Sequence, residues 1–269
     1  MPSVRAGGAE LAYDVSGEGP DVLLLHAGVT DRRSWRPLVE HLGLGYRCTT
    51  YDRRGFGETT YVPEPHDPVA DALAVLDAVD AADAIVVGAS NGGRWTIELA
   101  LAHPDRVAAL VLIAAGTRGG PPDDPTRFSP SVQALWAAYE AAEAAGDPAE
   151  LNGVEAHAWL DGWAAEEGRV RGPVRDLFLD MNAIALAAPE PGPEADRPPA
   201  WDLVHEIDVP TLVLCGDLDV VCLAASEHFA ASIPGARHEV LHGTGHLPHL
   251  EPHPRCLEAI SLFLVDVTT

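Results

Sequence analysis

A serine within a run of small residues is the first candidate for chemistry in this sequence. Ser90 lies in the segment Gly88-Ala-Ser-Asn-Gly92, between the apolar, β-branched run 85–87 and the Ala/Leu-rich run 96–102. A serine at a sharp turn from a strand into a helix has a strained backbone, and only small side chains fit two residues before and after it. The alternative is that Ser90 only caps the helix, but a cap does not require a glycine on both sides. The pattern therefore favours Ser90 as a nucleophile.

Acyl transfer by a hydroxyl group requires two further side chains and a pair of N–H donors. A base must accept the serine proton, an acid must orient and stabilise that base, and N–H groups must stabilise the oxyanion. The chain offers Asp219, which follows the apolar run 210–216, and His246, which ends the segment Gly243-Thr-Gly-His246. Together with Ser90 they form the predicted catalytic set.

Other residues compete for both of these roles. Asp217 is the neighbour of Asp219, which we prefer because it lies further out in the loop. His246 follows a glycine in a loop that leaves it room to move toward the serine. Three other histidines lie in the same region, and the first of them closes the preceding strand: His242, His249 and His253. We therefore predict His246 as the base and Asp219 as the acid.

The elements that carry these residues alternate between strands and helices. Apolar or alternating runs predict strands at 11–15, 21–25, 46–51, 84–87, 107–114, 210–216 and 237–241. Helical spacing predicts helices at 35–42, 68–82, 96–102, 224–232 and 257–265. Strands that alternate with helices pair in parallel through crossovers, so we predict an α/β fold with a mostly parallel, doubly wound sheet. Such sheets bind ligands beyond the carboxyl ends of their strands, where Ser90 and Asp219 both fall.

The alternation stops near Gly116, and a helical segment follows. Helices are predicted at 131–145, 149–167 and 173–187, before a Pro-rich stretch at 189–199. We expect residues 1–116 and 206–269 to form the core, and residues 117–205 to form a helical lid inserted between sheet strands. Most aromatic residues of the insertion are expected to pack the lid onto the core, while a minority line an apolar pocket. Four of the six tryptophans lie in it: Trp136, Trp159, Trp163 and Trp201.

These segments resemble those of the α/β-hydrolase superfamily, in which serine, acid and histidine follow one another in this chain order. The resemblance covers essentially the whole chain outside the insertion, and it implies Ser90 as nucleophile and His246 as general base and then acid. It implies Asp219 as the orienter of His246, three residues after the glycine that ends its strand. The matching segments are His26-Ala-Gly28, Tyr51-Asp-Arg-Arg-Gly-Phe-Gly57, Gly88-Ala-Ser-Asn-Gly-Gly93, 210–219 and Gly243-Thr-Gly-His246-Leu-Pro.

The resemblance also implies where the oxyanion donors lie. One is the backbone N–H of Asn91, the residue after the nucleophile. The other belongs to the loop after the strand that ends at Leu25, where Gly28 is the expected donor and Val29 the alternative. The family usually has a glycine where this chain has Ala27, and alanine is tolerated if that position does not need a positive φ. The Asn91 side chain either adds a polar group near the oxyanion or caps the following helix.

The substrate pocket is marked less sharply than the catalytic set. Arg53 and Arg54 either bind a substrate carboxylate or support the sheet edge, and the resemblance favours the second role. Arg94 is expected to form a structural ion pair rather than to contact substrate. The residues predicted to line the pocket are His26, Val29, Trp136, Trp159, Trp163 and Met181.

Composition narrows the classes of partner. The formal net charge is -24 and all 17 basic residues are arginine, which argues against nucleic acid and against anionic membranes. The four cysteines (Cys48, Cys215, Cys222 and Cys256) have no ligand spacing and are expected to be small buried hydrophobic residues. The histidines lack the spacing of metal ligands, and the sequence has no dinucleotide-binding fingerprint. We therefore expect neither a metal nor an organic cofactor. Because the sequence shows neither a signal core nor a membrane-spanning run, we expect a cytoplasmic protein; its oligomeric state is not indicated.

The expected reaction is hydrolysis of a small to medium, mostly apolar carboxylic ester or lactone through an acyl-enzyme on Ser90. An aspartate at that position would instead indicate an epoxide hydrolase or dehalogenase. The Arg-Arg-Gly-Phe-Gly loop also resembles cofactor-free haloperoxidases, perhydrolases and enol-lactonases. The alternatives are carbon-carbon bond hydrolysis or perhydrolysis on the same triad, and a non-catalytic protein of this fold that binds a small apolar ligand.

Overall fold

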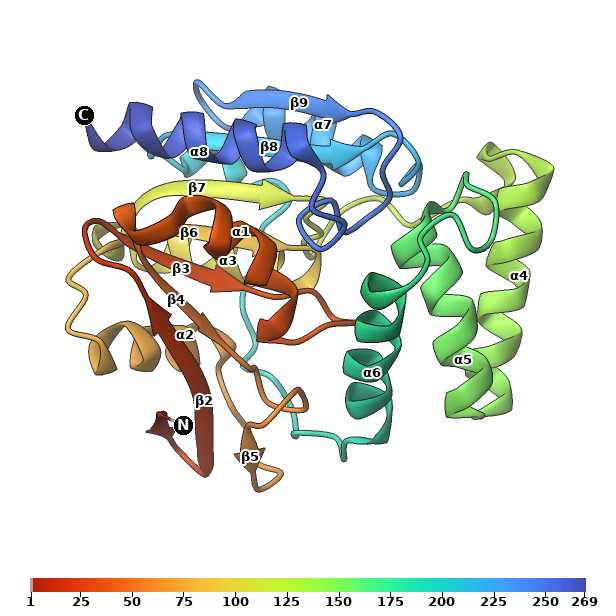
Figure 1. Cartoon of the computed structure of the whole chain (residues 1–269), viewed down its shortest axis with the longest axis horizontal. Coiled ribbons are helices and arrows are strands. Elements are labelled where there is room, and N and C mark those ends of the chain that lie inside the picture. Colours follow the sequence, from red (N-terminus) through yellow and green to blue (C-terminus); the bar gives the residue numbers. More distant parts are fainter. Residues whose placement is uncertain (1) are drawn as a thin grey trace.

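One mixed sheet forms the centre of the computed structural model, which describes residues 2–269 (Figure 1). The strands are β1 (Ser3–Ala6), β2 (Ala9–Ser16), β3 (Asp21–Leu25), β4 (Arg47–Tyr51), β5 (Thr60–Tyr61), β6 (Ala84–Ala89), β7 (Val107–Ile113), β8 (Thr211–Gly216) and β9 (Arg237–Leu241). Their order is β1-β2-β4-β3-β6-β7-β8-β9, with β5 paired to β2. From β4 to β9 all neighbours are parallel, whereas β1, β2 and β5 add an antiparallel edge. The predicted α/β fold with a mostly parallel sheet is confirmed.

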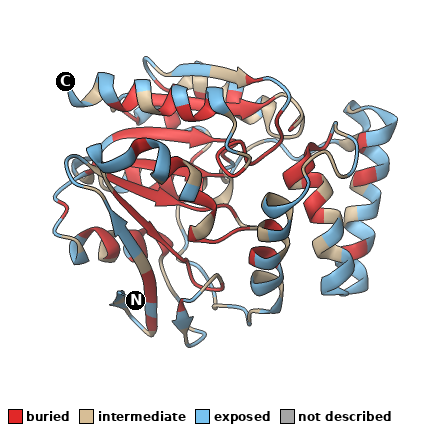
Figure 2. Cartoon of the chain, viewed as in Figure 1, coloured by how far each residue is buried: buried red, intermediate tan, exposed pale blue. Residues whose placement is uncertain are grey.

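Helices cover both faces of this sheet. On one face lie α1 (Arg36–Leu42) and α8 (Pro254–Thr268); on the other lie α2 (Pro68–Ala78), α3 (Asn91–Ala102) and α7 (Leu223–Ser232). Successive side chains of a strand point to opposite faces, so Leu24 packs in the first layer and Leu23 in the second. Burial on both faces explains why β3, β6 and β8 are continuous apolar runs, and Figure 2 shows the central strands as the most buried part of the molecule.

Short 3-10 helices connect several of these elements. They are η1 (Arg32–Trp35), η2 (Gly43–Gly45), η3 (Pro104–Arg106), η4 (Pro125–Arg127) and η6 (Val204–Glu206).

The segment between β7 and β8 is helical. It contains α4 (Pro130–Ala145), α5 (Pro148–Glu155), the π-helix η5 (Ala156–Gly162) and α6 (Pro173–Ala187). In Figure 1 these helices stand beyond the carboxyl ends of the parallel strands. They have a small apolar cluster of their own, in which Trp163 packs against Val132 and Leu135. Their outer faces are largely exposed (Figure 2).

The chain returns from α6 to the core along residues 188–197, which we call the return segment. The Pro191 and Pro193 carbonyl groups accept from the N–H groups of Glu64 and His66, both at 3.0 Å. The Ala195 N–H donates to the His66 carbonyl oxygen at 2.7 Å. Residues 191–195 therefore lie along 64–66 as a short parallel pairing at the edge of the core.

Two predicted helices end earlier in the structure than in the sequence analysis. The helix predicted at 149–167 ends with η5, because Gly162 takes a φ of +106° and the Asp161 carboxylate accepts the N–H groups of Gly168 and Val170. The helix predicted at 68–82 ends at Ala78, because Asp80 adopts a left-handed backbone with a φ of +53°. The short strands β1 and β5 have no strong alternation and were not predicted.

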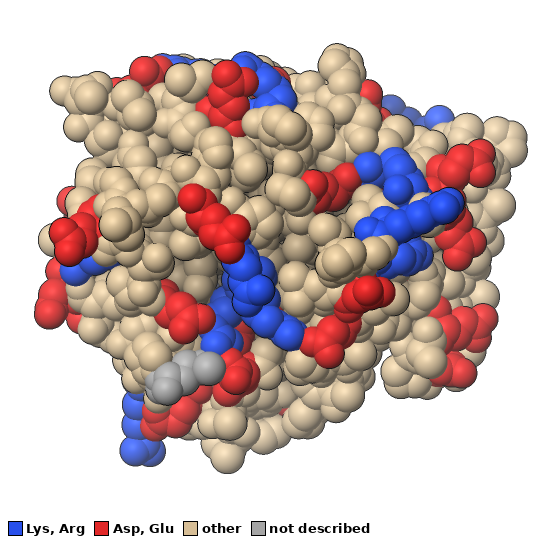
Figure 3. Space-filling model, viewed as in Figure 1, with Lys and Arg blue, Asp and Glu red and all other residues tan. Residues whose placement is uncertain are grey.

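Two surface properties bear on possible partners. Among residues 2–269, no helix is both long and apolar enough to cross a membrane. On the face shown in Figure 3, the arginine side chains gather in small groups that acidic side chains border.

Candidate active site

Ser90 lies in a strained turn between β6 and α3. Its backbone has a φ of +52° and a ψ of -119°, and its N–H donates to the Ile113 carbonyl at 2.9 Å. A Cβ on Gly92 would lie 2.1 Å from the Leu25 carbonyl oxygen, and one on Gly88 would lie 2.2 Å from Thr96 Oγ1. Because the backbone of this turn touches its neighbours directly, only glycine fits at both positions.

The alternative role of Ser90 as a helix cap is not seen. Ser90 occupies the N-cap position of α3, yet its side chain accepts no hydrogen bond from the first turn. A capping residue also has an extended backbone, whereas Ser90 has a positive φ. Such strain in a non-glycine residue is typical of functional sites, where the surrounding structure enforces it.

Asp219 and His246 meet beyond the ends of β8 and β9. Asp219 Oδ2 lies 2.6 Å from His246 Nδ1, and both side chains are buried. Within residues 2–269, neither His246 Nε2 nor Ser90 Oγ has a hydrogen-bond partner, so no protein group competes for them. The indole ring of Trp159 covers the imidazole, with ring centres 4.7 Å apart.

The loop that carries His246 is fixed from two sides. Glu251 accepts the Gly245 N–H at 3.0 Å and the Thr244 hydroxyl at 2.6 Å. Arg169, from the helical insertion, donates to both oxygens of the same carboxylate at 2.6 and 2.8 Å. Sequence reasoning missed Arg169 and Glu251, because an ion pair between residues 82 positions apart leaves no local pattern.

The competing aspartate and histidine form a second, outer pair. Asp217 Oδ2 lies 3.0 Å from His242 Nδ1, and the His242 side chain is 89% exposed. His249 is buried and stacks on Trp35 with ring centres 4.2 Å apart, and His253 lies 3.2 Å from the His242 carbonyl. Only the Asp219–His246 pair is buried, which makes it the better candidate for oriented proton transfer.

The predicted oxyanion donors lie next to one another. A Cβ on Gly28 would be 3.7 Å from the Asn91 Cβ, so the loop after β3 and the start of α3 are in contact. Asn91 is the first residue of α3, and its N–H has no acceptor within the helix. Among the described residues, the N–H groups of Gly28 and Val29 also donate to no acceptor. Ala27 has no positive φ, so the alanine at this family glycine position introduces no strain.

His26 holds the same loop rather than lining a cavity. The Arg53 N–H donates to His26 Nε2 at 3.1 Å, so Nδ1 carries the hydrogen and donates to the Ala27 carbonyl at 2.8 Å. Full burial, together with the nearby charge of Arg53, holds the pKa of His26 well below its ordinary value. The prediction that His26 lines the pocket is therefore corrected to a structural role.

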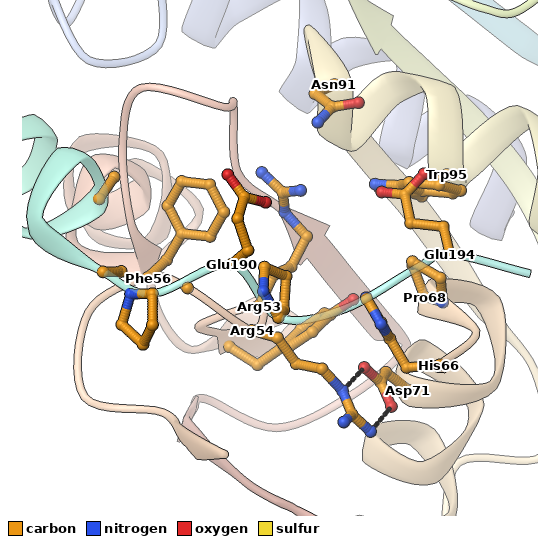
Figure 4. Close-up of a pocket in the computed structure, with 16 residues that line it drawn as sticks. Arg53, Arg54, Phe56, His66, Pro68, Asp71, Asn91, Trp95, Glu190 and Glu194 are labelled. Atoms are coloured by element: carbon orange, nitrogen blue, oxygen red, sulfur yellow. Dashed lines mark hydrogen bonds and ion pairs between the residues drawn. The ribbon is translucent and has the colours of Figure 1, made fainter. Parts of the chain in front are cut away.

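Two cavities flank the serine turn. One, of about 300 Å³, is lined by aromatic residues of the insertion and by Cys222; we call it the tryptophan cavity. Its aromatic wall consists of Trp136, Trp159 and Trp201. The other, of about 240 Å³, lies between the loop 53–56, Asn91 and the return segment; we call it the arginine cavity (Figure 4).

Three residues predicted to line the pocket lie elsewhere. Trp163 is buried behind Trp136 and Trp159, with ring centres 5.2 Å from each. Met181 is fully buried in the core layer, where Val29 also packs. Trp163 and Met181 are hydrophobic as predicted, but the packing of the insertion uses these side chains, so they support the cavity wall from behind. Val29 is half-buried and lines neither of the two cavities.

Cys222 is closer to the candidate residues than its sequence position suggested. Its Sγ lies 3.6 Å from His246 Nδ1, and it is half-buried rather than a core residue. Atoms of Asp219, Cys222 and His246 lie within 4.8 Å of one another, a donor set that metals such as zinc use. Burial and the Asp219 charge raise the pKa of the thiol, which opposes the thiolate that a metal needs.

Arg54 and Arg94 have structural partners, as expected. Arg54 donates to both oxygens of Asp71, at 2.8 and 3.1 Å, and to Glu64 at 3.0 Å. Arg94 pairs with Glu98 at 3.1 Å and stacks on the neighbouring Trp95. Arg53, in contrast, forms no ion pair with a described residue.

Known proteins resemble this chain along its length. A protein of Bacillus subtilis described as a putative 2-succinyl-6-hydroxy-2,4-cyclohexadiene-1-carboxylate synthase is 28% identical, over 95% of each chain. A malate-bound esterase of Thermogutta terrifontis is 28% identical in sequence, with a TM-score of 0.77 over 99% of this chain and 98% of its own. Est816, described as an N-acyl homoserine lactone degrading enzyme, is 25% identical with a TM-score of 0.71 over 97% of this chain and all of its own. Residues 22–259 match the alpha/beta hydrolase family as a whole, and the chain therefore belongs to that family.

Proposed function

We propose that this protein is a serine hydrolase that cleaves a small to medium, mostly apolar carboxylic ester or lactone. The observation that carries the proposal is Ser90 in its strained turn, with the buried Asp219–His246 pair beyond the same edge of the sheet. Esters and lactones require only a nucleophile, a base, an acid and an oxyanion hole.

The proposed reaction has two half-reactions. Ser90 Oγ attacks the substrate carbonyl while His246 Nε2 takes the hydroxyl proton, and the N–H groups of Asn91 and Gly28 stabilise the oxyanion. His246 returns the proton to the leaving alcohol, which leaves an acyl group on Ser90. In the second half-reaction, His246 takes a proton from water while the water oxygen attacks the acyl group. His246 then returns that proton to Ser90 Oγ, and the acid product is released. Asp219 fixes the imidazole tautomer and stabilises the imidazolium.

The insertion, residues 117–205, is the proposed substrate-binding lid. Trp159 both covers His246 and lines the tryptophan cavity, so an apolar group bound there would lie against the base. The proposal is supported by the likeness to an esterase and to a lactone-degrading enzyme over nearly the whole chain.

The decisive experiment follows the release of p-nitrophenol from a short-chain ester before the steady state. We expect a burst with the wild-type protein, and a loss on the order of 10⁶ in kcat for Ser90→Ala. Asp219→Asn removes the orienting charge and is expected to lower kcat by about 10⁴. Asp217→Asn is the matched control, because the amide oxygen can still accept the Gly243 N–H, now at 2.8 Å, while the charge in the exposed pair with His242 is removed, and it is expected to change kcat by less than about threefold.

Each contrary result has a definite meaning. Equal activity of Ser90→Ala and wild type would rule out Ser90 as the nucleophile. A larger loss of kcat for Asp217→Asn than for Asp219→Asn would show that Asp217, and not Asp219, is the acid that orients the base. Absence of turnover on short, long and cyclic esters, together with ligand-induced thermal stabilisation, would indicate a non-catalytic binding protein of the same fold.

A further inference from the structure

Arg53 is a buried cation without an acidic partner. Only 8% of the residue is exposed, yet within residues 2–269 no carboxylate lies within 4.0 Å of its guanidinium. Nη2 donates to the Ala27 carbonyl at 3.0 Å, and the group lies 4.5 Å from the centre of the Phe56 ring. Nε is buried and has no acceptor among these described residues. An arginine has five N–H donors, so most of its capacity here is unused.

The neighbouring residue shows what a structural arginine looks like in this protein. Arg54 is bound by Asp71, Glu64 and the Ala6 carbonyl, and Figure 4 shows its guanidinium directed at Asp71, away from Arg53. Burying an unpaired charge is costly unless something compensates it. The compensating group for Arg53 is therefore expected from outside the chain.

Arg53 lines the arginine cavity, close to the candidate catalytic groups. Arg53 and Asn91 both line this cavity, and the Asn91 side chain, which makes no hydrogen bond with a described residue, lies on the same side of it (Figure 4). Asn91 directly follows Ser90, and Ala27, the acceptor for Arg53, directly precedes Gly28. A group bound to Arg53 would thus sit beside both proposed oxyanion donors.

We propose that the arginine cavity binds a carboxylate carried by the acyl part of the substrate, with Arg53 as its main partner and the Asn91 amide as a second donor. This inference rests on the proposed ester hydrolysis and deepens it: the substrate is a monoester of a short dicarboxylic acid, or a lactone that carries a carboxylate. The acyl part takes part in both half-reactions, since it is transferred to Ser90 in the first and released from Ser90 in the second, so a carboxylate held by Arg53 orients it in each of them. A guanidinium binds a carboxylate through two parallel N–H donors, which gives both affinity and orientation.

Other charges around the cavity are consistent with a single anion site. Glu194 pairs with Arg94 at 3.0 Å and with Arg118 at 3.2 Å. Glu190 is exposed and makes no ion pair with a described residue. Burial lowers the pKa of Arg53 to about 10, which still leaves the guanidinium charged at neutral pH.

The test compares two p-nitrophenyl esters of equal chain length, the glutarate monoester and the neutral valerate ester, after subtraction of the uncatalysed rates. We expect wild type to prefer the glutarate monoester by at least about tenfold in kcat/KM. Arg53→Gln is expected to lower kcat/KM for the glutarate monoester by about 100-fold, and for valerate by less than about threefold, since the loss is that of a charge-assisted pair. The succinate and adipate monoesters are measured alongside to find the chain length that the cavity fits.

Two further variants separate local from general charge effects. Arg106→Gln removes a positive charge that pairs with Asp77 away from the cavity, and it is expected to change kcat/KM for both esters by less than about threefold. Glu190→Gln removes a negative charge from the wall and is expected to raise kcat/KM for the glutarate monoester by about threefold.

The alternative role for Arg53 is to hold the oxyanion loop through the Ala27 carbonyl. In that case Arg53→Gln would reduce the hydrolysis of both esters equally, and the proposal would be overturned. It would also be overturned if wild type showed no preference for any of the three monoesters.

Direct binding separates this proposal from the proposed function. Glutarate, the acid product, is titrated into wild type and Arg53→Gln by calorimetry. Binding that disappears in Arg53→Gln would retain the carboxylate site even if no ester were cleaved, whereas ester cleavage without Arg53-dependent glutarate binding would retain the hydrolase and reject the site.

Discussion

The two sides of the candidate site are built by different kinds of contact. On the sheet side, Ser90, Asp219 and His246 lie on turns whose backbones touch one another, as the glycine positions at 88, 92 and 216 show. On the insertion side, the walls are large side chains such as Trp136 and Trp159, which are only partly buried. The comparison indicates that backbone contact fixes the reacting groups, while large side chains form much of the wall of the tryptophan cavity. The backbone contacts at the turns should tolerate no added atom. Substitutions in the tryptophan cavity should change substrate selectivity before they change the stability of the fold.

The difference between the two sides is tested most strongly by adding one methyl group to each of them. Gly92→Ala would place a Cβ 2.1 Å from the Leu25 carbonyl oxygen, so buried backbone must shift. We expect the free energy of unfolding to fall by about 3 kcal/mol, measured by urea denaturation.

Gly153→Ala is the matched control on the insertion side. Gly153 lies in α5, and a Cβ there would meet nothing within 4 Å. Alanine is the better helix former, so this variant is expected to gain about 0.5–1 kcal/mol. Equal effects of the two substitutions would show that the two sides do not differ as described.

A smaller effect is expected from the aromatic wall. Trp159→Ala removes the ring that covers His246 as well as part of the tryptophan cavity. We expect kcat/KM to fall about tenfold on methyl acetate and further on acetate esters of longer alcohols, because the ring contributes contact area to both base and substrate.

Trp136→Ala serves as the comparison for that measurement. Trp136 lines the same cavity, but its indole N–H donates to Glu140 at 2.9 Å and its ring is not in contact with His246. It is expected to change the dependence on the length of the alcohol part while leaving methyl acetate hydrolysis within about threefold. An equal loss on methyl acetate for both variants would contradict a specific role of Trp159 at His246.

The smallest effect concerns the pH dependence of stability on the sheet side. Burial lowers the pKa of His249 to about 3, against an ordinary value of 6.5, so the unfolded chain takes up a proton that the folded protein excludes. Stability is therefore lost as the pH falls below 6.5, by about 1 kcal/mol between pH 6.5 and pH 5.5.

His249→Phe keeps the ring that stacks on Trp35 and removes the titrating group. Urea denaturation across this pH range should give a shallower slope for the variant by about that amount. An unchanged slope would mean that other groups, such as the buried His26, account for the pH dependence.

The sequence predicted the parallel sheet and its strand-end turns because each depends on local patterns. The apolar run before Ser90 and the glycines around it are continuous in the chain, and so are the residues before Asp219 and His246. The cavities could not be predicted in the same way. Trp159 and Trp163 are four residues apart in one segment, yet one lines a cavity and the other is buried behind it, and only the packing of the insertion decides between them.

Charge pairing was beyond the sequence for the same reason. Arg53 and Arg54 are adjacent and chemically identical, and the sequence analysis gave them one shared role. Their difference arises because Asp71 and Glu64 reach Arg54 alone. The sequence likewise predicted Cys222 to be a core cysteine, whereas in the structure its sulfur lies 3.6 Å from His246 Nδ1.

The return segment gives the arginine cavity a property that the tryptophan cavity lacks. Its carbonyl groups at Pro191 and Pro193 are paired to the core at 64–66, and its prolines restrict the backbone further. The conformational entropy of this wall is therefore lost when the protein folds, and a ligand that binds against it does not have to order it again. A pre-organised wall favours short, rigid acids over long, flexible ones, so chain length should be selected more sharply at this cavity than among the tryptophans.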